Sequence, residues 1–298
     1  MSLVSYVQAR RRTNTDIKQA IEKSLDLIEY SFEKEIRNVV IKPNLCYYWD
    51  YSTGQTTDPN FVAELIDIIR HKVSHNVNVS VIESDASAMK CEYAFKILGY
   101  EKMANHHDVT LVNLSEETAK EVNVRVQDQS FSFNVPLIIQ NADLRINVPK
   151  IKYMIKTKIS CALKNIFGCN PYPNKFKYHR MLDEIIVALN KIMKFDLCIL
   201  DGIIVFGSQP CKLGLVMASR DPVALDVAAA RIAGVNPSSV RHIMLANQEG
   251  IGNNALIPRG ANPSSFKSKY PKKRPIDRLT YSAYMLLTKL NLLSTELT

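Results

Sequence analysis

"NVVIKPNL" (residues 38–45), "TTDPNFVAELIDII" (56–69) and "VNVSVIESDA" (77–86) together decide the fold class. The first and third stretches are short apolar runs that end in polar residues, which is typical of buried strands. Asp58-Pro59 predicts a helix start between them, because aspartate caps the first turn and proline fits the first helical position. A strand, a helix and another strand in this order favour a parallel sheet covered by helices.

The same alternation continues along the chain. Further strands are expected at 4–8, 109–114, 142–150, 196–202 and 213–219, and helices at 15–32, 88–98, 158–168, 181–193 and 222–233. Residues 121–134 alternate apolar and polar side chains, which predicts a small antiparallel hairpin. The predicted fold class is therefore α/β, with a mainly parallel sheet, helices on both faces and this hairpin. We expect residues 1–257 to form this domain, with room for two lobes, and 258–298 to form a basic segment and a C-terminal helix.

Composition limits the classes of protein to consider. The 298 residues are 46% hydrophobic and 22% charged, which is typical of a globular chain, and the net charge of +9 predicts an anionic partner. The six cysteines contain no C-x-x-C pair, so no intrinsic iron–sulfur cluster is expected. The sequence shows neither a signal peptide nor an apolar run long enough to cross a membrane, and a cytoplasmic location is expected.

Polar residues gather where the expected strands end. They are Lys42, Asn44, Glu83, Asp85, Lys150, Lys152 and Asp201. Because ligands of open parallel sheets bind beyond the carboxyl ends of the strands, these side chains could converge on one crevice. The alternative is that any strand must end in polar residues. Thr57 belongs to "GQTTDPNF" (54–61), which is either an anion cradle at a helix N-terminus or a simple helix cap.

The stretch "KISCALKNIFGC" (158–169) places Lys164, Asn165 and Gly168 on one side of the expected helix. An ammonium, an amide and a close backbone approach suit an anionic or metal-bound ligand. The alternative is an exposed lysine on a helix that ends at a glycine.

Nine basic residues lie between 145 and 180, and no Asp or Glu occurs from 144 to 182. Because like charges repel, this imbalance indicates an anion. His179 could act there as an acid, a base or a ligand, or it could be an ordinary surface residue. Asp226 shares a helix face with Val223, so it needs a partner, which could be a crevice lysine or a divalent metal held with Asp201.

The C-terminal stretch "FKSKYPKKRPIDRLTYSAYMLLTKLNLL" (266–293) joins a basic segment to an apolar one. It could make peripheral contact with a membrane or a partner, or it could dock on the domain. Nucleic-acid binding is not supported, because no aromatic residues interleave with the basic run and no recognised motif occurs.

Several stretches together resemble a known family, the domain of unknown function family 362. They are "IKPNL", "TTDPNFVAELI", "VIESDA", "LGY", "ADLRINVPKIK", "CALKNIFGC" with a following histidine, "ILDG" and "LVMASRDPVALDVAAARIAG", between about residues 37 and 252. The resemblance implies an α/β protein with no defined reaction, often linked to a ferredoxin-like domain or to redox genes. The family's motifs carry over to Lys42, Asn44, Thr57, Asp58, Asp85, Lys150, Lys152, Lys164, Asn165, Gly168, His179, Asp201, Gly202, Asp221 and Asp226.

The chain departs from the family pattern at two places. Met154 stands where the family often has a histidine, and Gln209-Pro210 stands where Gly-Pro is usual, in a shortened loop. These departures count against a metal site that needs that histidine. The spacing of "ADLRINVPK", the lysine-bearing helix and the later histidine is also similar to the nickel-pincer lactate racemase family, as a hint about architecture alone.

The sequence therefore favours an enzyme of undefined reaction class that acts on a small anionic metabolite. Whether a divalent metal assists the reaction stays open. The expected catalytic residues are Lys164, His179 and Asp226, the ligand-binding residues are Lys42, Asn44, Thr57, Lys150, Lys152, Asn165 and Gly168, and the metal ligands are Asp201 and Asp226. The alternative is a non-catalytic redox-partner or cofactor-assembly protein that works with a separate iron–sulfur protein.

Overall fold

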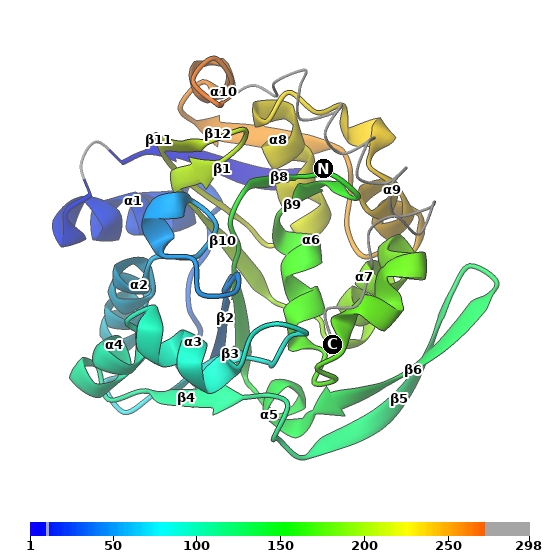
Figure 1. Ribbon diagram of the computed structural model, residues 1–298. Helices are drawn as coiled ribbons and strands as arrows, with labels where there is room; N and C mark the ends of the chain where they lie inside the picture. Colours follow the sequence, from blue (N-terminus) through cyan, green and yellow to red (C-terminus); the bar gives the residue numbers. More distant parts are fainter. Residues whose placement is uncertain (10–11, 272–298) are drawn as a thin grey trace.

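A computed structural model describes residues 1–9 and 12–271. These residues form a twisted, mainly parallel sheet that is covered by helices (Figure 1). In order across the sheet, its strands are β12 (Leu256–Gly260), β1 (Ser2–Gln8), β11 (Pro210–Ser219), β10 (Leu197–Phe206), β7 (Leu144–Val148), β2 (Asn38–Pro43), β3 (Asn78–Glu83) and β4 (Thr110–Asn113). From β10 to β4 all neighbours are parallel, while β11 runs antiparallel to both β10 and β1.

Two smaller antiparallel pairs accompany the sheet. Strands β8 (Lys152–Met154) and β9 (Lys158–Ser160) pair with each other, and β8 joins the end of β10. Strands β5 (Ala119–Val126) and β6 (Gln129–Pro136) form the separate hairpin that the alternating residues 121–134 predict.

Helices cover both faces of the sheet. One face carries α1 (Asn14–Leu27), α2 (Pro59–Lys72), α3 (Cys91–Ile97) and α4 (Tyr100–His106), and the other carries α6 (Ala162–Asn165), α7 (Leu182–Ile192), α8 (Pro222–Ile232) and α9 (Arg241–Gln248). The shorter helices are α5 (Leu137–Gln140) and α10 (Pro263–Lys267), with 3-10 turns η1 (Tyr51–Thr53), η2 (Ile166–Cys169), η3 (Lys175–Met181) and η4 (Pro237–Ser239). The predicted fold class is confirmed.

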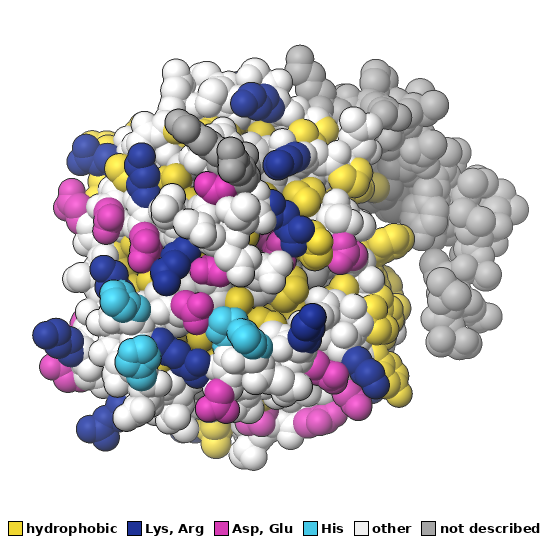
Figure 2. Space-filling model, turned by 90° about the vertical axis from the view of Figure 1, so that its left-hand side faces the viewer, with side chains coloured by type: hydrophobic (Ala, Val, Ile, Leu, Met, Phe, Trp, Pro, Cys, Tyr) yellow, Lys and Arg dark blue, Asp and Glu magenta, His cyan; other side chains and the backbone are white. Residues whose placement is uncertain are grey.

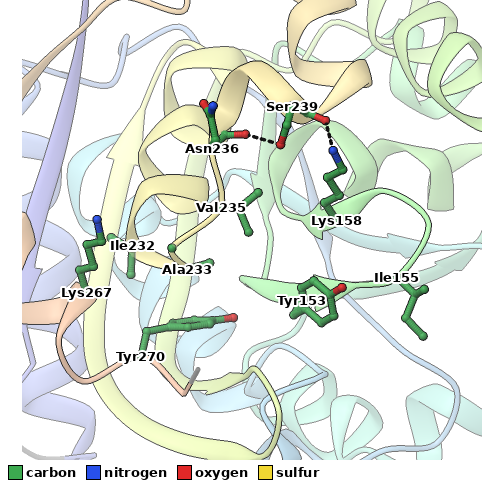
Figure 3. A pocket seen from close by; sticks show the side chains of 11 residues that line it. Tyr153, Ile155, Lys158, Ile232, Ala233, Val235, Asn236, Ser239, Lys267 and Tyr270 are labelled. Atoms are coloured by element: carbon green, nitrogen blue, oxygen red, sulfur yellow. Dashed lines mark hydrogen bonds between the residues drawn. The ribbon is translucent and has the colours of Figure 1, made fainter. Parts of the chain in front are cut away.

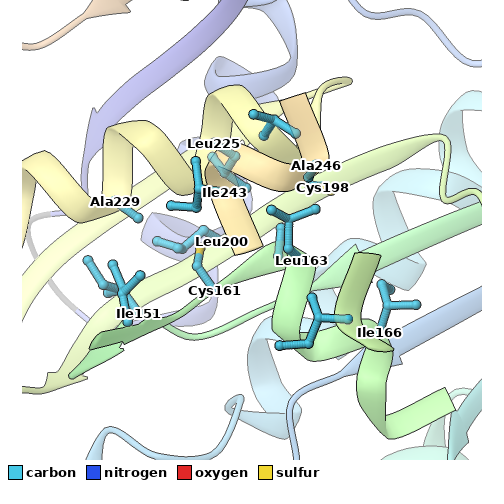
Figure 4. Packing of buried hydrophobic residues seen from close by; sticks show 14 of the residues in the cluster. Ile151, Cys161, Leu163, Ile166, Cys198, Leu200, Leu225, Ala229, Ile243 and Ala246 are labelled. Atoms are coloured by element: carbon cyan, nitrogen blue, oxygen red, sulfur yellow. The ribbon is translucent and has the colours of Figure 1, made fainter. Parts of the chain in front are cut away.

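Two hydrophobic cores lie on the two faces, because successive strand residues point to opposite sides. On β10, Cys198 and Leu200 belong to the core beneath α6 and α8, whereas Ile199 and Ile203 belong to the core beneath α1 and α2. Figure 4 shows the first of these cores, in which α6, α8 and α9 pack together over β10. The sheet therefore separates side chains on its two faces.

The structure corrects two element boundaries. The stretch 158–168 is not one helix: it comprises β9, α6 and η2, and the break has a backbone cause, since Lys158 has a φ of 63° and Cys161 a φ of −151°. The first helix ends at Leu27 and not at residue 32, because Glu29 adopts a φ of 57°.

The C-terminal expectations are settled only in part. The sheet continues past residue 257, since β12 pairs with β1. The expected C-terminal helix and basic tail lie largely in 272–298, outside the described residues. Within the described ranges, no helix combines the length and apolar character that a membrane crossing requires.

The strand order reverses between β2 and β7. The chain proceeds from β2 to β3 and β4 on one side, and then returns to place β7 on the other side of β2. In open α/β sheets such a reversal opens a crevice outside the carboxyl ends of the strands, where ligands bind.

Candidate functional site

A cavity of about 360 Å³ lies at this strand reversal. It is bounded by the ends of β2 and β3, the β8–β9 pair, helix α6 and turn η3, and we call it the crevice. Among the residues that line it are seven of those expected from the sequence, namely Lys42, Asn44, Lys152, Lys164, Asn165, Gly168 and His179. Of the strand-end residues expected to converge, Lys42, Asn44, Glu83 and Lys152 line the crevice, whereas Asp85, Lys150 and Asp201 do not. Thr57 and Asp226 do not line it either.

Two of the expected lysines are neutralised by buried carboxylates. The Lys42 ammonium lies 2.7 Å from Glu83, and the Lys150 ammonium lies 3.0 Å from Asp201. All four side chains are at most 4% exposed. Because each charge already has its partner, these pairs leave little net charge for a ligand. Lys42 and Glu83 line the crevice, whereas Lys150 and Asp201 do not.

Three other lysines have no carboxylate within 4 Å among the described residues: Lys152, Lys164 and Lys175. Lys152 donates to the Gln55 carbonyl oxygen at 3.1 Å, and Lys175 donates to the Ser84 hydroxyl at 2.8 Å. Lys164 is half-buried and has no hydrogen-bond partner in that part of the chain. The crevice thus holds an excess of positive charge in a partly desolvated place.

The same burial perturbs these ammonium groups. It lowers the pKa of Lys164 to about 8, and the nearby charge of Lys152 lowers it further. Burial also lowers the pKa of Lys152 and brings that of Lys175 to about 8. An anion in the crevice would restore the charged forms of all three.

His179 faces the crevice from η3. Burial lowers the pKa of its imidazole, and the charges of Lys156 and Lys164 lower it further. The imidazole is therefore mainly neutral at pH 7 and can accept a proton there.

Asn165 fixes α6 across the strand reversal. Its amide nitrogen donates to the carbonyl oxygens of Lys42 and Pro43 on β2, at 3.2 and 3.4 Å, and to the side chain of Asn147 on β7 at 2.8 Å. Asn165 is 5% exposed, and these hydrogen bonds hold α6 against β2 and β7.

Asp226, expected from the sequence to be catalytic, does not line the crevice. Its carboxylate accepts hydrogen bonds from the backbone nitrogens of Ala162, at 2.6 Å, and of Leu163, at 3.3 Å. It therefore caps the N-terminus of α6 from the neighbouring helix α8. Burial raises the pKa of Asp226 to about 6, although His242, 4.0 Å away, and these hydrogen bonds oppose the shift.

The two expected metal ligands, Asp201 and Asp226, lie on opposite faces of the sheet. Asp201 points to the face that carries α2, where it accepts a hydrogen bond from the backbone nitrogen of Asp58 at 3.0 Å. Asp226 lies on α8, above the opposite face. No group of three His, Cys, Asp or Glu side chains suited to a metal ion occurs in residues 1–9 and 12–271.

Thr57 links the residue after β2 to the end of β7 and does not line the crevice. Its hydroxyl donates to the Val148 carbonyl oxygen at 2.9 Å and accepts from the backbone nitrogen of Asn44 at 2.9 Å. The expected cradle is therefore a cap and a strand junction. Gly168 does line the crevice, and its carbonyl oxygen accepts a hydrogen bond from Ser84.

Sequence reasoning missed Lys175, Ser84 and Gln55 as parts of the site. Lys175 was visible as a member of the unbalanced basic run, which was the available signal. Ser84 and Gln55 lie in the quoted stretches 77–86 and 54–61, but the sequence did not single them out, because their contacts are with residues distant in the chain.

Basic residues also lie on other surfaces. A second cavity of about 580 Å³, shown in Figure 3, lies between β8 and the end of α8, and its lining includes Lys267 and Lys158, which donates to the Ser239 carbonyl oxygen. The face on the left of Figure 1 bears acidic and basic side chains intermingled (Figure 2). The excess of positive charge is therefore not displayed as a continuous patch on that face.

The chain is similar to known proteins in family, in sequence and in fold. Residues 39–231 match the domain of unknown function family DUF362. The chain is 30% identical over 148 residues to the thylakoid-associated protein sll1697 of Synechocystis sp., across 45% of this chain and 43% of that relative. The chain thus matches less than half the length of this curated relative. It is also similar to the lactate racemase apoprotein of Thermoanaerobacterium thermosaccharolyticum, with a TM-score of 0.49 and 10% identity over 79% of this chain and 58% of that chain.

Proposed function

This chain belongs to the DUF362 family, and we propose that it is an enzyme that acts on a small anionic metabolite bound in the crevice. Lys152 and Lys164 bind the anionic group, and His179 accepts a proton from the bound molecule. Lys175 adds positive charge behind them.

One observation carries this proposal: Lys164 is half-buried in the crevice with neither a hydrogen bond nor a carboxylate partner in the described part of the chain. A desolvated ammonium without a partner is unfavourable, and a bound anion removes that cost. Lys42 and Lys150 provide the contrast, since each has its own buried carboxylate.

Calorimetric titration with inorganic phosphate and with acetate tests the binding step. We expect Lys164→Met to weaken the binding of at least one of these ions by about tenfold or more, since a charge-assisted contact contributes about 1.5–3 kcal/mol. Lys102→Met is the matched control, because Lys102 is an exposed lysine on α4 and its loss changes the net charge equally. Equal affinities in the two variants would refute the site.

Turnover needs a separate test. The protein is incubated in D₂O with a mixture of anionic metabolites, and mass spectrometry detects deuterium uptake or a change in mass. We expect His179→Gln to abolish the change while phosphate or acetate still binds. A wild-type protein that binds anions but alters no metabolite would be a binding protein and not an enzyme.

Membrane association is a second candidate function. The similar Synechocystis protein is named as thylakoid-associated, and residues 267–274 of this chain, "KSKYPKKR", are strongly basic. Vesicles with anionic lipids should sediment the wild type but not a variant with Lys272, Lys273 and Arg274 changed to Gln. Equal sedimentation of both would remove this candidate.

A further inference from the structure

The crevice has apolar walls above its lysines. Tyr47, Met89, Met154, Phe167 and Phe176 line it together with the polar residues described above. Its volume of about 360 Å³ falls within the range of sites for drug-sized ligands, about 300–1,000 Å³. An inorganic ion or acetate bound at the lysines would leave these walls in contact with water.

Some of the apolar side chains that line the crevice are exposed. Of the nine exposed large apolar side chains in the described residues, Tyr47 and Phe176 line the crevice, and Tyr48 and Trp49 follow Tyr47 in the sequence. Ile155 and Tyr172 line two other cavities. Isolated exposed apolar residues are normal on a protein surface, but a cluster beside a cavity marks a binding site.

Two of these aromatic residues are held in specific arrangements. Tyr47 adopts a φ of 51°, a left-handed conformation that is uncommon for a residue other than glycine and that persists where the surroundings enforce it. The ring of Phe176 meets the imidazole of His179 edge to face, with centroids 5.1 Å apart. The apolar wall and the candidate proton acceptor therefore form one continuous surface.

We propose that the crevice selects an amphipathic anion, in which an acidic group joins an aromatic or similarly apolar body. The acidic group lies on Lys152 and Lys164, and the apolar body lies between Tyr47 and Phe176. This inference rests on the proposed function and narrows its substrate class. Charge complementarity with the unpaired lysines distinguishes such a ligand from an uncharged apolar partner.

The test compares phenylacetate with acetate, which lacks the ring, and with 2-phenylethanol, which lacks the charge. Binding is measured by calorimetry and by the fluorescence of Trp49, the single tryptophan of the chain, whose side chain is 52% exposed two residues from Tyr47. We expect phenylacetate to bind at least about tenfold more tightly than either comparator. Burial of the ring, which acetate lacks, contributes about 1.5–3 kcal/mol, and the charge-assisted contact, which 2-phenylethanol lacks, contributes about 1.5–3 kcal/mol.

Phe176→Ala should bring the affinity for phenylacetate to within about threefold of that for acetate. Phe176 is 59% exposed, so its loss should leave the fold intact, and Tyr93→Ala, which removes a 55% exposed aromatic residue on α3, is the control. We expect the Tyr93 variant to retain the preference for phenylacetate.

The outcomes separate this inference from the function on which it rests. If Lys164→Met weakens acetate and phenylacetate equally, and the wild type binds both alike, the amphipathic class is refuted while the anion site stands. If Lys164→Met leaves the binding of phenylacetate by the protein unchanged but Phe176→Ala abolishes it, the apolar walls of the crevice bind the ring without help from Lys164. That result would refute both proposals. If neither acid binds, the inference is refuted together with the acetate arm of the proposed function.

Discussion

Lys42 and Glu83 stand at the ends of the adjacent parallel strands β2 and β3 and form an ion pair of 2.7 Å, with side chains that are 1% and 4% exposed. The Lys42 ammonium also donates to the carbonyl oxygen of Pro43 at 2.7 Å. The pair lies directly beneath Gly168, so it supports the part of the crevice that η2 forms.

Removing one partner of this pair should destabilise the protein strongly. Lys42→Met leaves the Glu83 carboxylate buried, with only the backbone nitrogens of Ser84 and Leu45 as donors at 3.0 and 3.4 Å. We expect the free energy of unfolding in urea to fall by about 3–5 kcal/mol. The double variant Lys42→Met with Glu83→Gln should regain part of this loss, because no unpaired charge remains. A double variant no more stable than the single one would contradict this account.

Gly168→Ala should also destabilise the fold, through contact and not through backbone strain. A Cβ atom at residue 168 would lie 2.8 Å from Glu83 Oε1 and 3.0 Å from Lys42 Nζ, and Gly168 does not adopt a positive φ. Hydrogen bonds to the Pro43 carbonyl oxygen and from the Ser84 backbone nitrogen hold Lys42 and Glu83 in place, so the pair cannot move away freely. We expect the free energy of unfolding to fall by about 1–3 kcal/mol. Urea unfolding measures the loss, and a change below about 0.5 kcal/mol would show that the pair yields without cost.

The fold was predictable because its local signals agree with its tertiary structure. Asp58-Pro59 and Asp221-Pro222 begin α2 and α8 as expected, since both aspartates accept hydrogen bonds from the first turn of their helices. The prediction of one helix over 158–168 was wrong, because the β8–β9 pairing and the positive φ of Lys158 override the helical pattern of apolar residues. A local pattern cannot reveal a pairing that depends on the end of β10.

The site was predictable in its charge but not in its partners. The unbalanced basic run located Lys164, and the strand ends located Lys42 and Lys152. Which lysines are neutralised depends on carboxylates that other strands supply, and sequence spacing does not show those contacts. Asp226 was expected to need a partner, and the backbone nitrogens at the start of α6 donate hydrogen bonds to it.

The buried carboxyl of Asp226 should make stability depend on pH. Its folded-state pKa of about 6 lies above the ordinary value of 3.8, so the folded protein holds this proton more tightly than the unfolded chain does. The stabilisation is therefore complete below about pH 4 and is lost as the pH rises through about 6. Between pH 4.5 and pH 7 we expect the wild type to lose about 2 kcal/mol relative to Asp226→Asn, which has no titrating group. Urea unfolding of both proteins at pH 4.5 and pH 7 measures the difference, and parallel pH profiles would show that Asp226 titrates as an ordinary carboxyl.

Anion affinity should fall in alkaline solution because Lys164 loses its charge there. Its pKa of about 8 lies below the ordinary value of 10.5, so the free protein begins to lose this ammonium just above neutral pH. We expect the affinity for acetate to fall by about tenfold between pH 7 and pH 9.5, since only the protonated amine attracts the carboxylate. Lys164→Arg should bind acetate with little dependence on pH over this range, because guanidinium remains charged. Calorimetry at four pH values compares the two proteins. An equal decline in the arginine variant would assign the titration to another group, of which Lys175, with a pKa also of about 8, is the nearest candidate.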